Sequence, residues 1–141
     1  MRFWDSSALV MLIVEQPGAP DVRALLRSDS EVLMWWGSPV ECVSALARLE
    51  REGALTEPAI RVALASLAKL EAGCHHVSPT EAVREVAKRI LRVHPLRAAD
   101  ALQLSAAIVA AAGRPGELPF VTLDVNLASA ASREGFPILP P

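Results

Sequence analysis

Four acidic residues occupy positions from which their carboxylates could act together: Asp5, Glu41, Asp100 and Asp124. Carboxylates that are brought together without a counter-charge repel one another, and one takes up a proton unless a cation holds it ionised. A set made only of oxygen ligands favours Mg²⁺ or Mn²⁺ over zinc. Such an ion lowers the pKa of bound water and orients a phosphodiester. Hydrolysis of a phosphodiester by metal-activated water is therefore the chemistry that this set predicts.

Two of the acids are placed by predicted strands. Asp5 directly follows a short strand at residues 2–4, and Asp124 directly follows the clearest strand of the chain, at residues 120–123. Because ligands of an open parallel sheet bind beyond the carboxyl ends of its strands, we expect both acids at that edge. Ser7 is a candidate helper, which either caps the first helix or hydrogen-bonds a metal-bound water beside Asp5.

The other two acids are predicted in the first turns of helices. Glu41 opens the helix that follows a buried strand at residues 32–35. Asp100 begins the helix at residues 98–112, in which it is the only charged residue. Both first turns are expected at the same edge of the sheet, so that four separated acids converge on one cleft.

Each acid also has a purely structural interpretation. Asp5 and Asp124 are in position to cap helices. The run Ser38-Pro-Val-Glu41 has the form of a capping box, and Asp100 is an acid that a helix dipole favours in the first turn. A structural explanation must account for all four acids at once, which makes a shared site the better hypothesis.

Strands alternate with helices along the whole sequence, without repeats or linkers. We predict strands at residues 2–4, 32–35, 76–77, 120–123 and 136–139, and helices at residues 6–15, 21–27, from the Gly37 turn to about 52, 56–73, 79–93 and 98–112. The helix that starts at Pro79 is expected to be capped by Ser78. Strands joined through helices pair in parallel, which predicts a three-layer α/β/α sandwich with a central parallel sheet. Its 141 residues fit a single domain, 1–141.

The composition narrows the class of protein. A hydrophobic content of 52% excludes a disordered chain, and no stretch approaches the length of a membrane helix. No basic leader precedes the apolar residues 8–14, so we expect a cytoplasmic protein. The net charge of −2 argues against a protein that holds nucleic acid by its overall charge.

Phosphate contacts must therefore be local. The best candidates lie in one short basic stretch that leads to Asp100, and they are Arg84, Lys88, Arg89, Arg92 and Arg97. Arg97 is favoured because it is nearest to the acid, whereas a solvated helix face remains the alternative for Arg84 and Lys88. Among the tryptophans, Trp4 and Trp35 are expected in the core, and Trp36 could stack on a base.

The order of these motifs resembles that of the PIN domains, in the form found in VapC-type toxins. The similar segments are Asp5-Ser-Ser-Ala-Leu9, Trp36-Gly-Ser-Pro-Val-Glu-Cys-Val-Ser-Ala45, Arg97-Ala-Ala-Asp-Ala-Leu102, and Thr122-Leu-Asp124 with Leu127, Ala130 and Ala131 before Gly135. Each motif alone is common, but the ordered set spans nearly the whole chain. Relatives often carry a basic residue soon after the fourth acid, whereas Val125 and Asn126 stand here.

The resemblance implies an endoribonuclease that depends on Mg²⁺, with Mn²⁺ as an alternative, and that acts as the toxin of a VapBC-type pair. It implies a catalytic and metal-binding quartet of Asp5, Glu41, Asp100 and Asp124, an RNA substrate such as tRNA or another structured RNA, and a VapB-type antitoxin partner. Apolar residues in excess of what a sheet-facing surface needs also predict a homodimer or a partner groove; they are Leu12, Ile13, Val22, Leu25 and Leu26.

Two alternatives stay open at this point. A phospho-receiver signalling domain also collects acids at the strand ends of a parallel sheet, but it needs a lysine at a late strand end. The lysines here, Lys69 and Lys88, are predicted within helices. A PIN-like binding module that has lost its chemistry is the second alternative, against which the intact quartet argues.

Overall fold

The computed structural model describes residues 1–140. Its strands are β1 (Arg2–Trp4), β2 (Val32–Trp35), β3 (His75–Val77), β4 (Phe120–Val121) and β5 (Ile138–Leu139). Its helices are α1 (Ser6–Ile13), α2 (Ala19–Ser28), α3 (Ser38–Arg51), α4 (Glu57–Gly73), α5 (Glu81–Val93), α6 (Ala98–Ala111) and α7 (Val125–Arg133), with a short 3₁₀ helix η1 (Pro115–Glu117). None of the helices within this range is long and apolar enough to cross a membrane.

The strands form one sheet in the order β3-β2-β1-β4-β5, and every neighbouring pair is parallel. The first strand therefore lies at the centre, with β2 on one side and β4 on the other. Trp4 at the end of β1 is in register with Val121 at the end of β4. The predicted central parallel sheet is confirmed, and the chain leaves β1 and β4 at the same edge.

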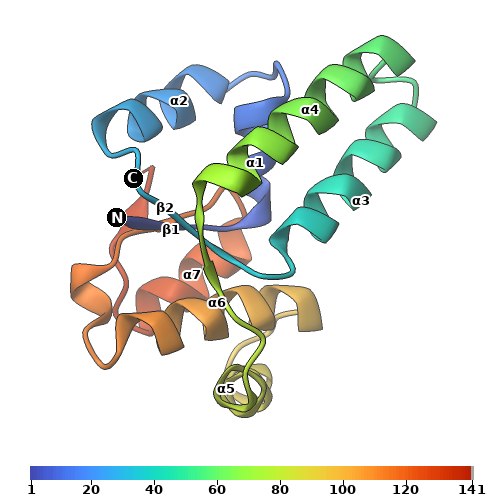
Figure 1. The fold of residues 1–141 in the computed structure, drawn as a ribbon. Helices are drawn as coiled ribbons and strands as arrows, with labels where there is room; N and C mark the ends of the chain where they lie inside the picture. Colours follow the sequence, from blue (N-terminus) through green and yellow to red (C-terminus); the bar gives the residue numbers. More distant parts are fainter. Residues whose placement is uncertain (141) are drawn as a thin grey trace.

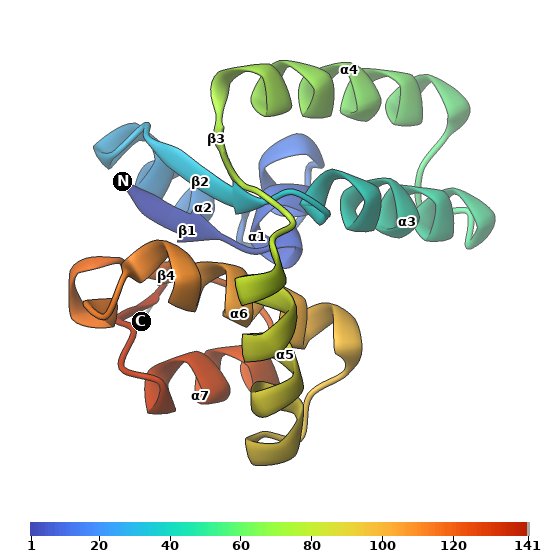
Figure 2. The ribbon, with the colours of Figure 1, turned by 60° about the horizontal axis from the view of Figure 1, so that its bottom comes forward.

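Helices cover both faces of the sheet (Figures 1 and 2). In Figure 1, α1, α2, α3 and α4 lie above the strands, and α5, α6 and α7 lie below them. Alternate residues of a strand face opposite layers: Phe3 packs with the α5–α7 side, and Trp4 packs with the α1–α4 side. Both side chains are fully buried, so the sheet sits between two cores. The three-layer α/β/α prediction is confirmed.

Several predicted boundaries were wrong. The cap of α5 is Thr80, whose hydroxyl accepts a hydrogen bond from the backbone N–H of Val83, and not Ser78. Strand β4 ends at Val121, so that Thr122 and Leu123 form a connection before Asp124 rather than the end of the strand. Strand β5 likewise begins at Ile138 and not at 136. These errors fall at element ends, where backbone hydrogen bonds to distant strands decide the limits.

Candidate active site

The parallel pairing of β1 with β4 brings the first and the last acid to one edge of the sheet. The backbone N–H of Asp5 donates a hydrogen bond to the carbonyl oxygen of Val121 (3.1 Å), which fixes the end of β1 beside the end of β4. Asp124 lies three residues further along, at the start of α7. The expectation that both acids lie beyond the same strand ends is met by this arrangement.

Asp5 is buried and held by two donors. Its Oδ1 accepts hydrogen bonds from the backbone N–H of Ala8 (3.2 Å) and from the hydroxyl of Ser7 (2.7 Å). The Ser7 hydroxyl in turn accepts a hydrogen bond from the backbone N–H of Leu123 (2.9 Å). Burial nevertheless raises the pKa of Asp5 from 3.8 to about 6, and these hydrogen bonds oppose the rise only in part. Asp5 therefore caps α1 and is also a poorly solvated carboxylate.

Asp124 is the N-cap of α7. Its Oδ1 accepts a hydrogen bond from the backbone N–H of Leu127 (2.8 Å), and its own N–H donates to Thr122 Oγ1 (3.1 Å). Thr122 Oγ1 also lies 3.4 Å from the hydroxyl of Ser7. A chain of hydroxyl groups thus links the Asp5 and Asp124 segments, and both acids have the capping role that the structural interpretation assigned to them.

The predicted capping box at the start of α3 is wrong. Gly37 is the N-cap, and Ser38 is already the first helical residue. The Ser38 hydroxyl is fully buried and bonds instead to the side-chain amide of Gln103 on α6 (3.2 Å to Oε1, 2.9 Å from Nε2). Gln103 Nε2 also donates a hydrogen bond to Glu41 Oε2. A contact across the sheet edge between α3 and α6 has replaced the local cap.

Glu41 and Asp100 experience the charge of the other acids. Burial, followed by the charges of Asp5 and Asp100, raises the pKa of Glu41 from 4.5 to about 7, against the lowering effect of the Gln103 hydrogen bond. Burial and the charge of Asp124 raise the pKa of Asp100. Each carboxylate of the predicted quartet is thus within electrostatic range of another member, which is the situation that a bound cation relieves.

The four carboxylates of the quartet do not converge on one point in this structure. Among residues 1–140, no three side chains of the His, Cys, Asp and Glu types are grouped closely enough to hold a metal ion in this conformation. The carboxylates of Asp5, Glu41 and Asp124 are each turned toward a hydrogen-bond donor of the protein. All four side chains offer carboxylate oxygen atoms, the ligands that Mg²⁺ prefers, so the residue types fit such an ion.

An open pocket of about 480 Å³ lies between α1, α3 and the start of α6. Its lining includes Glu41 and Asp100 together with Ser7, and Asp5 lies directly behind Ser7. Two arginines, Arg48 and Arg97, also line it. The pocket therefore combines acids with cations at the edge of the sheet where the acids were predicted.

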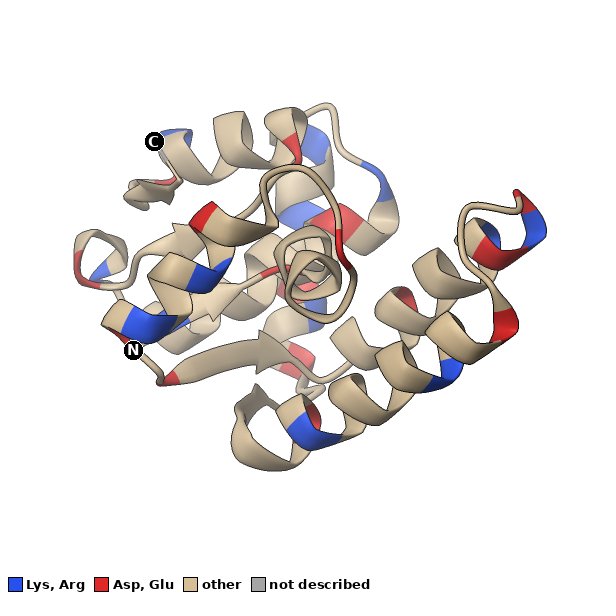
Figure 3. Cartoon of the chain, turned by 90° about the horizontal axis from the view of Figure 1, so that it is seen from above, with Lys and Arg blue, Asp and Glu red and all other residues tan. Residues whose placement is uncertain are grey.

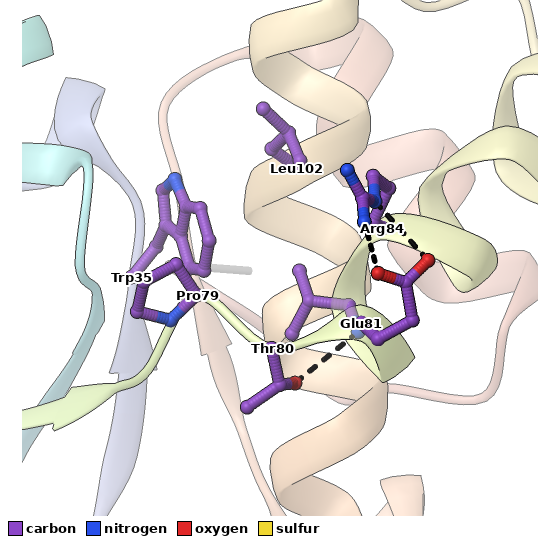
Figure 4. Close-up of a pocket in the computed structure, with 7 residues that line it drawn as sticks. Trp35, Pro79, Thr80, Glu81, Arg84 and Leu102 are labelled. Atoms are coloured by element: carbon purple, nitrogen blue, oxygen red, sulfur yellow. Dashed lines mark hydrogen bonds and ion pairs between the residues drawn. The ribbon is translucent and has the colours of Figure 1, made fainter.

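Most of the predicted basic stretch is engaged elsewhere. Arg84 is ion-paired with Glu81 beside a separate cavity of about 320 Å³ between β2, α5 and α6 (Figure 4). Lys88 pairs with Glu85 (2.5 Å), and Arg89 reaches Glu134 (2.9 Å), 45 residues away. Of that stretch only Arg97 lines the acidic pocket.

Two residues of the site were missed by the sequence reasoning. Gln103 is a buried polar residue in a mostly apolar helix, and that contrast was its only signal. Arg48 lies seven residues after Glu41, which is two helical turns, so the spacing was a signal for a shared face. The prediction that Trp4 and Trp35 lie in the core is confirmed, since both are buried; Trp36 is 59% exposed, and its stacking on a base stays a prediction.

The sequence matches the PIN domain family over residues 2–133. It is 30% identical over 138 residues to Ribonuclease VapC49 of Mycobacterium tuberculosis, covering 98% of this chain and 94% of that protein. The fold is similar to the structure of FitAcB from Neisseria gonorrhoeae, with a TM-score of 0.66, 19% identity, and coverage of 98% and 96% of the two chains. A toxin–antitoxin complex from Klebsiella pneumoniae has a chain with a TM-score of 0.60, at 14% identity and 91% coverage of both chains.

These matches run through the strand ends and helix starts that carry the four acids, and they span nearly all of each protein. The identity of 30% over the full domain goes beyond a shared fold. The chain therefore belongs to the PIN domain family, among its VapC-type members.

Proposed function

We propose that the protein is a Mg²⁺- or Mn²⁺-dependent endoribonuclease and the toxin of a VapBC-type toxin–antitoxin pair. The observation that carries the proposal is the gathering of carboxylates at one sheet edge, next to an open pocket that Glu41 and Asp100 line. Membership of the PIN family and the ribonuclease names of the curated relatives support the same activity. Family membership also leaves no place for the phospho-receiver alternative.

Asp5, Glu41, Asp100 and Asp124 are the residues that would hold the ion. When bound, a divalent cation would activate water and orient the phosphodiester for in-line attack. The protein contributes the positioning: Ser7 and the Ala8 N–H orient Asp5, and Gln103 orients Glu41. The buried position of Asp5 also excludes bulk water from one side of the site, which strengthens electrostatic interactions there.

RNA is the proposed substrate, and Arg97 is its first contact. The arginine precedes α6 by one residue and lowers the pKa of Asp100 through its charge, while burial and Asp124 raise it. A guanidinium at this place binds phosphate oxygens next to the acids. Because RNA is found in the cytoplasm, a cytoplasmic site of action is part of the proposal.

The antitoxin partner is supported by the structural neighbour, which is a toxin–antitoxin complex. A shallow groove of about 480 Å³ between α1, α2 and α4 offers this chain a surface for it. Its lining is apolar with a basic margin, and comprises Leu12, Ile13, Arg23, Leu26, Arg27, Ser66, Lys69 and Leu70. An apolar antitoxin helix that carries acidic residues fits this chemistry. Val22, which was expected to contribute, is instead fully buried.

A homodimer completes the proposal. The outward face of α3 and the turn before it expose Trp36 (59%), Val40 (71%) and Val43 (45%). Large exposed apolar side chains that lie three and four residues apart form a continuous stripe on a helix, and a second copy would bury it. The mass of the purified protein in solution, measured by light scattering, tests this part independently of activity.

Cleavage of a mixed tRNA and structured-RNA pool tests the activity. The purified protein is incubated with Mg²⁺, Mn²⁺ or EDTA, alongside the variants Asp5→Asn and Asp100→Asn. An exposed acid far from the site, Asp21 at the start of α2, provides the matched control Asp21→Asn. We expect cleavage that needs metal, is lost in both site variants and persists in the control. Metal binding without cleavage of any RNA would instead favour the PIN-like binding module.

A further inference from the structure

The cations of this protein fall into two groups. Seven of the 14 Lys and Arg side chains lie within 4.0 Å of a carboxylate: Arg2, Arg23, Arg61, Arg84, Lys88, Arg89 and Arg114. They belong to β1, to several helices and to the segment before η1, and Figure 3 shows Lys and Arg interleaved with Asp and Glu along the chain. Within residues 1–140, Arg48 and Arg97 have no such partner at that distance, and both line the acidic pocket. Of the seven cations without such a partner in this range, these two are placed beside the acids, whereas the other five lie outside the pocket lining.

Arg48 occupies the wall of the pocket that α3 forms. Glu41, Ser44, Ala45 and Arg48 all line the pocket, a spacing that puts them on one face of the helix. Seven residues correspond to a rise of about 10 Å along the helix axis, so the backbone of Arg48 stands roughly that far from the backbone of Glu41. Arg97 lies on the opposite wall, close to Asp100. The acids are thus flanked by one near cation and one distant cation.

This spacing has a consequence for an extended substrate. A strand whose cleaved phosphate lies at the acids must carry its neighbouring phosphates across the rest of the pocket. Those phosphates are repelled by carboxylates and attracted by a guanidinium, which binds phosphate oxygens in a two-pronged geometry. Arg48, which is rooted two helical turns beyond Glu41, is placed to meet such a neighbouring phosphate, whereas Arg97 is the cation next to the acids.

We propose that Arg48 binds a phosphate of the RNA strand next to the one that is cleaved, so that the strand runs from the acids along α3. The inference builds on the proposed ribonuclease function. It implies a substrate of several nucleotides, because a shorter RNA bound at the acids would not extend far enough along α3 to reach Arg48. The overall charge of −2 makes such a local contact necessary.

The test compares Arg48→Gln with Arg51→Gln. Arg51 ends the same helix, is exposed, and lies outside the pocket lining, so both variants remove one charge from α3. Binding of labelled single-stranded RNA is measured at several salt concentrations with Ca²⁺ in place of Mg²⁺, and cleavage is measured with Mn²⁺. The RNA is a nested series of one mixed sequence shortened from either end.

For Arg48→Gln, we expect affinity for long RNA to fall about tenfold and the slope of log affinity against log salt to decrease by about 0.7 to 1. KM should rise while kcat changes little, and the difference from wild type should vanish for the shortest RNAs. Calorimetric Mn²⁺ affinity should be unchanged. Arg51→Gln should match wild type throughout.

The inference is overturned if the two variants behave alike, or if the effect of Arg48→Gln is the same at every RNA length. In either case the ribonuclease proposal stands, provided that the wild-type protein cleaves RNA. A wild-type protein that neither binds nor cleaves any RNA would remove the proposed function and this inference together.

Discussion

Gln103 on α6 donates a hydrogen bond from its side-chain amide to the carboxylate of Glu41 on α3. The same amide group is bonded to the hydroxyl of Ser38, one helical turn before Glu41. The side chains of Ser38, Glu41 and Gln103 meet where α3 and α6 come together at the strand ends. Gln103 and Ser38 are buried. Glu41 is therefore oriented by a residue 62 positions away in the chain.

Replacement of Gln103 by Leu should weaken metal binding. It removes the donor that lowers the pKa of Glu41 and frees the carboxylate to rotate. We expect Mn²⁺ affinity, measured by calorimetry, to fall roughly tenfold or more. Ser38→Ala is the control, because it removes a buried bond to Gln103 without touching Glu41, and should cost about 1 kcal/mol of stability with a smaller effect on affinity. Equal Mn²⁺ affinities for wild type and Gln103→Leu would contradict the positioning role.

Two substitutions of Asp124 should separate its capping role from its role toward a metal. Asp124→Ser keeps a side chain that can accept from the Leu127 N–H, whereas Asp124→Ala does not. Thermal unfolding should show a loss of about 1 kcal/mol for the Ala variant and little for the Ser variant. Both should lose RNA cleavage by at least roughly tenfold. Cleavage at the wild-type rate by Asp124→Ser would show that Asp124 is only a cap.

The stability of the metal-free protein should fall as the pH rises from about 4 to about 7. Burial raises the pKa of Asp5 to about 6 and that of Glu41 to about 7, from 3.8 and 4.5. In this range the folded protein binds more protons than the unfolded chain, so the free energy of unfolding decreases with pH. The contribution of the buried Asp5 is on the order of 3 kcal/mol.

Urea unfolding in EDTA at a series of pH values measures this effect. Asp5→Asn should flatten the profile, since the amide cannot ionise. Added Mg²⁺ should reverse the trend near pH 7, because the ion binds the deprotonated carboxylates. A metal-free stability that stays level or increases from pH 4 to pH 7 is the result that this prediction cannot accommodate.

Ser7→Ala should affect the site more than Ser6→Ala. The Ser7 hydroxyl donates to Asp5 and accepts from the Leu123 N–H, and so joins α1 to the segment before α7. Its removal should cost about 1–2 kcal/mol in chemical unfolding and lower the Mn²⁺ affinity. Ser6 also lines the pocket, which makes Ser6→Ala the neighbouring control. Similar losses for the two variants would mean that the Ser7 bonds have no special role.

The groove between α1, α2 and α4 can be tested through Leu70. Leu70→Glu places a charge in its apolar lining, and we expect antitoxin binding to weaken roughly tenfold or more while RNA cleavage continues. Leu64→Glu on the same helix is the control, because Leu64 is exposed and lies outside the groove. The readout is copurification of the coexpressed cognate antitoxin with each tagged variant. Undiminished copurification with Leu70→Glu would place the antitoxin on another surface.

Much of the fold could be predicted from local patterns. Apolar strands followed by helices indicate parallel pairing, because a helix between two strands returns the chain to the same edge. That rule alone predicted Asp5 and Asp124 at one edge, and the β1–β4 pair confirms it. The helix starts that carry Glu41 and Asp100 follow from the same alternation. Their convergence required no knowledge of side-chain contacts.

The partners of individual side chains could not be predicted in this way. The Ser38 hydroxyl was predicted to accept a hydrogen bond from a backbone N–H of its own helix. It bonds instead to Gln103, 65 residues away. Arg89 has acids on its own helix, yet it forms its ion pair with the carboxylate of Glu134, directly after α7. In both cases, packing of distant segments brings the partner into reach; for the buried Ser38 hydroxyl, that partner is the buried side chain of Gln103.

The sequence by itself determined the layer order, the edge at which the acids gather and the family, because these depend on the periodicity of apolar residues and on short motifs. Only the tertiary structure decided which cations remain for a substrate. Arg89 is neutralised by Glu134, 45 residues away, whereas Arg48 comes to line the acidic pocket. Between residues far apart in the sequence, the distances of a few ångströms on which charge pairing depends are set by helix packing rather than by position along the chain.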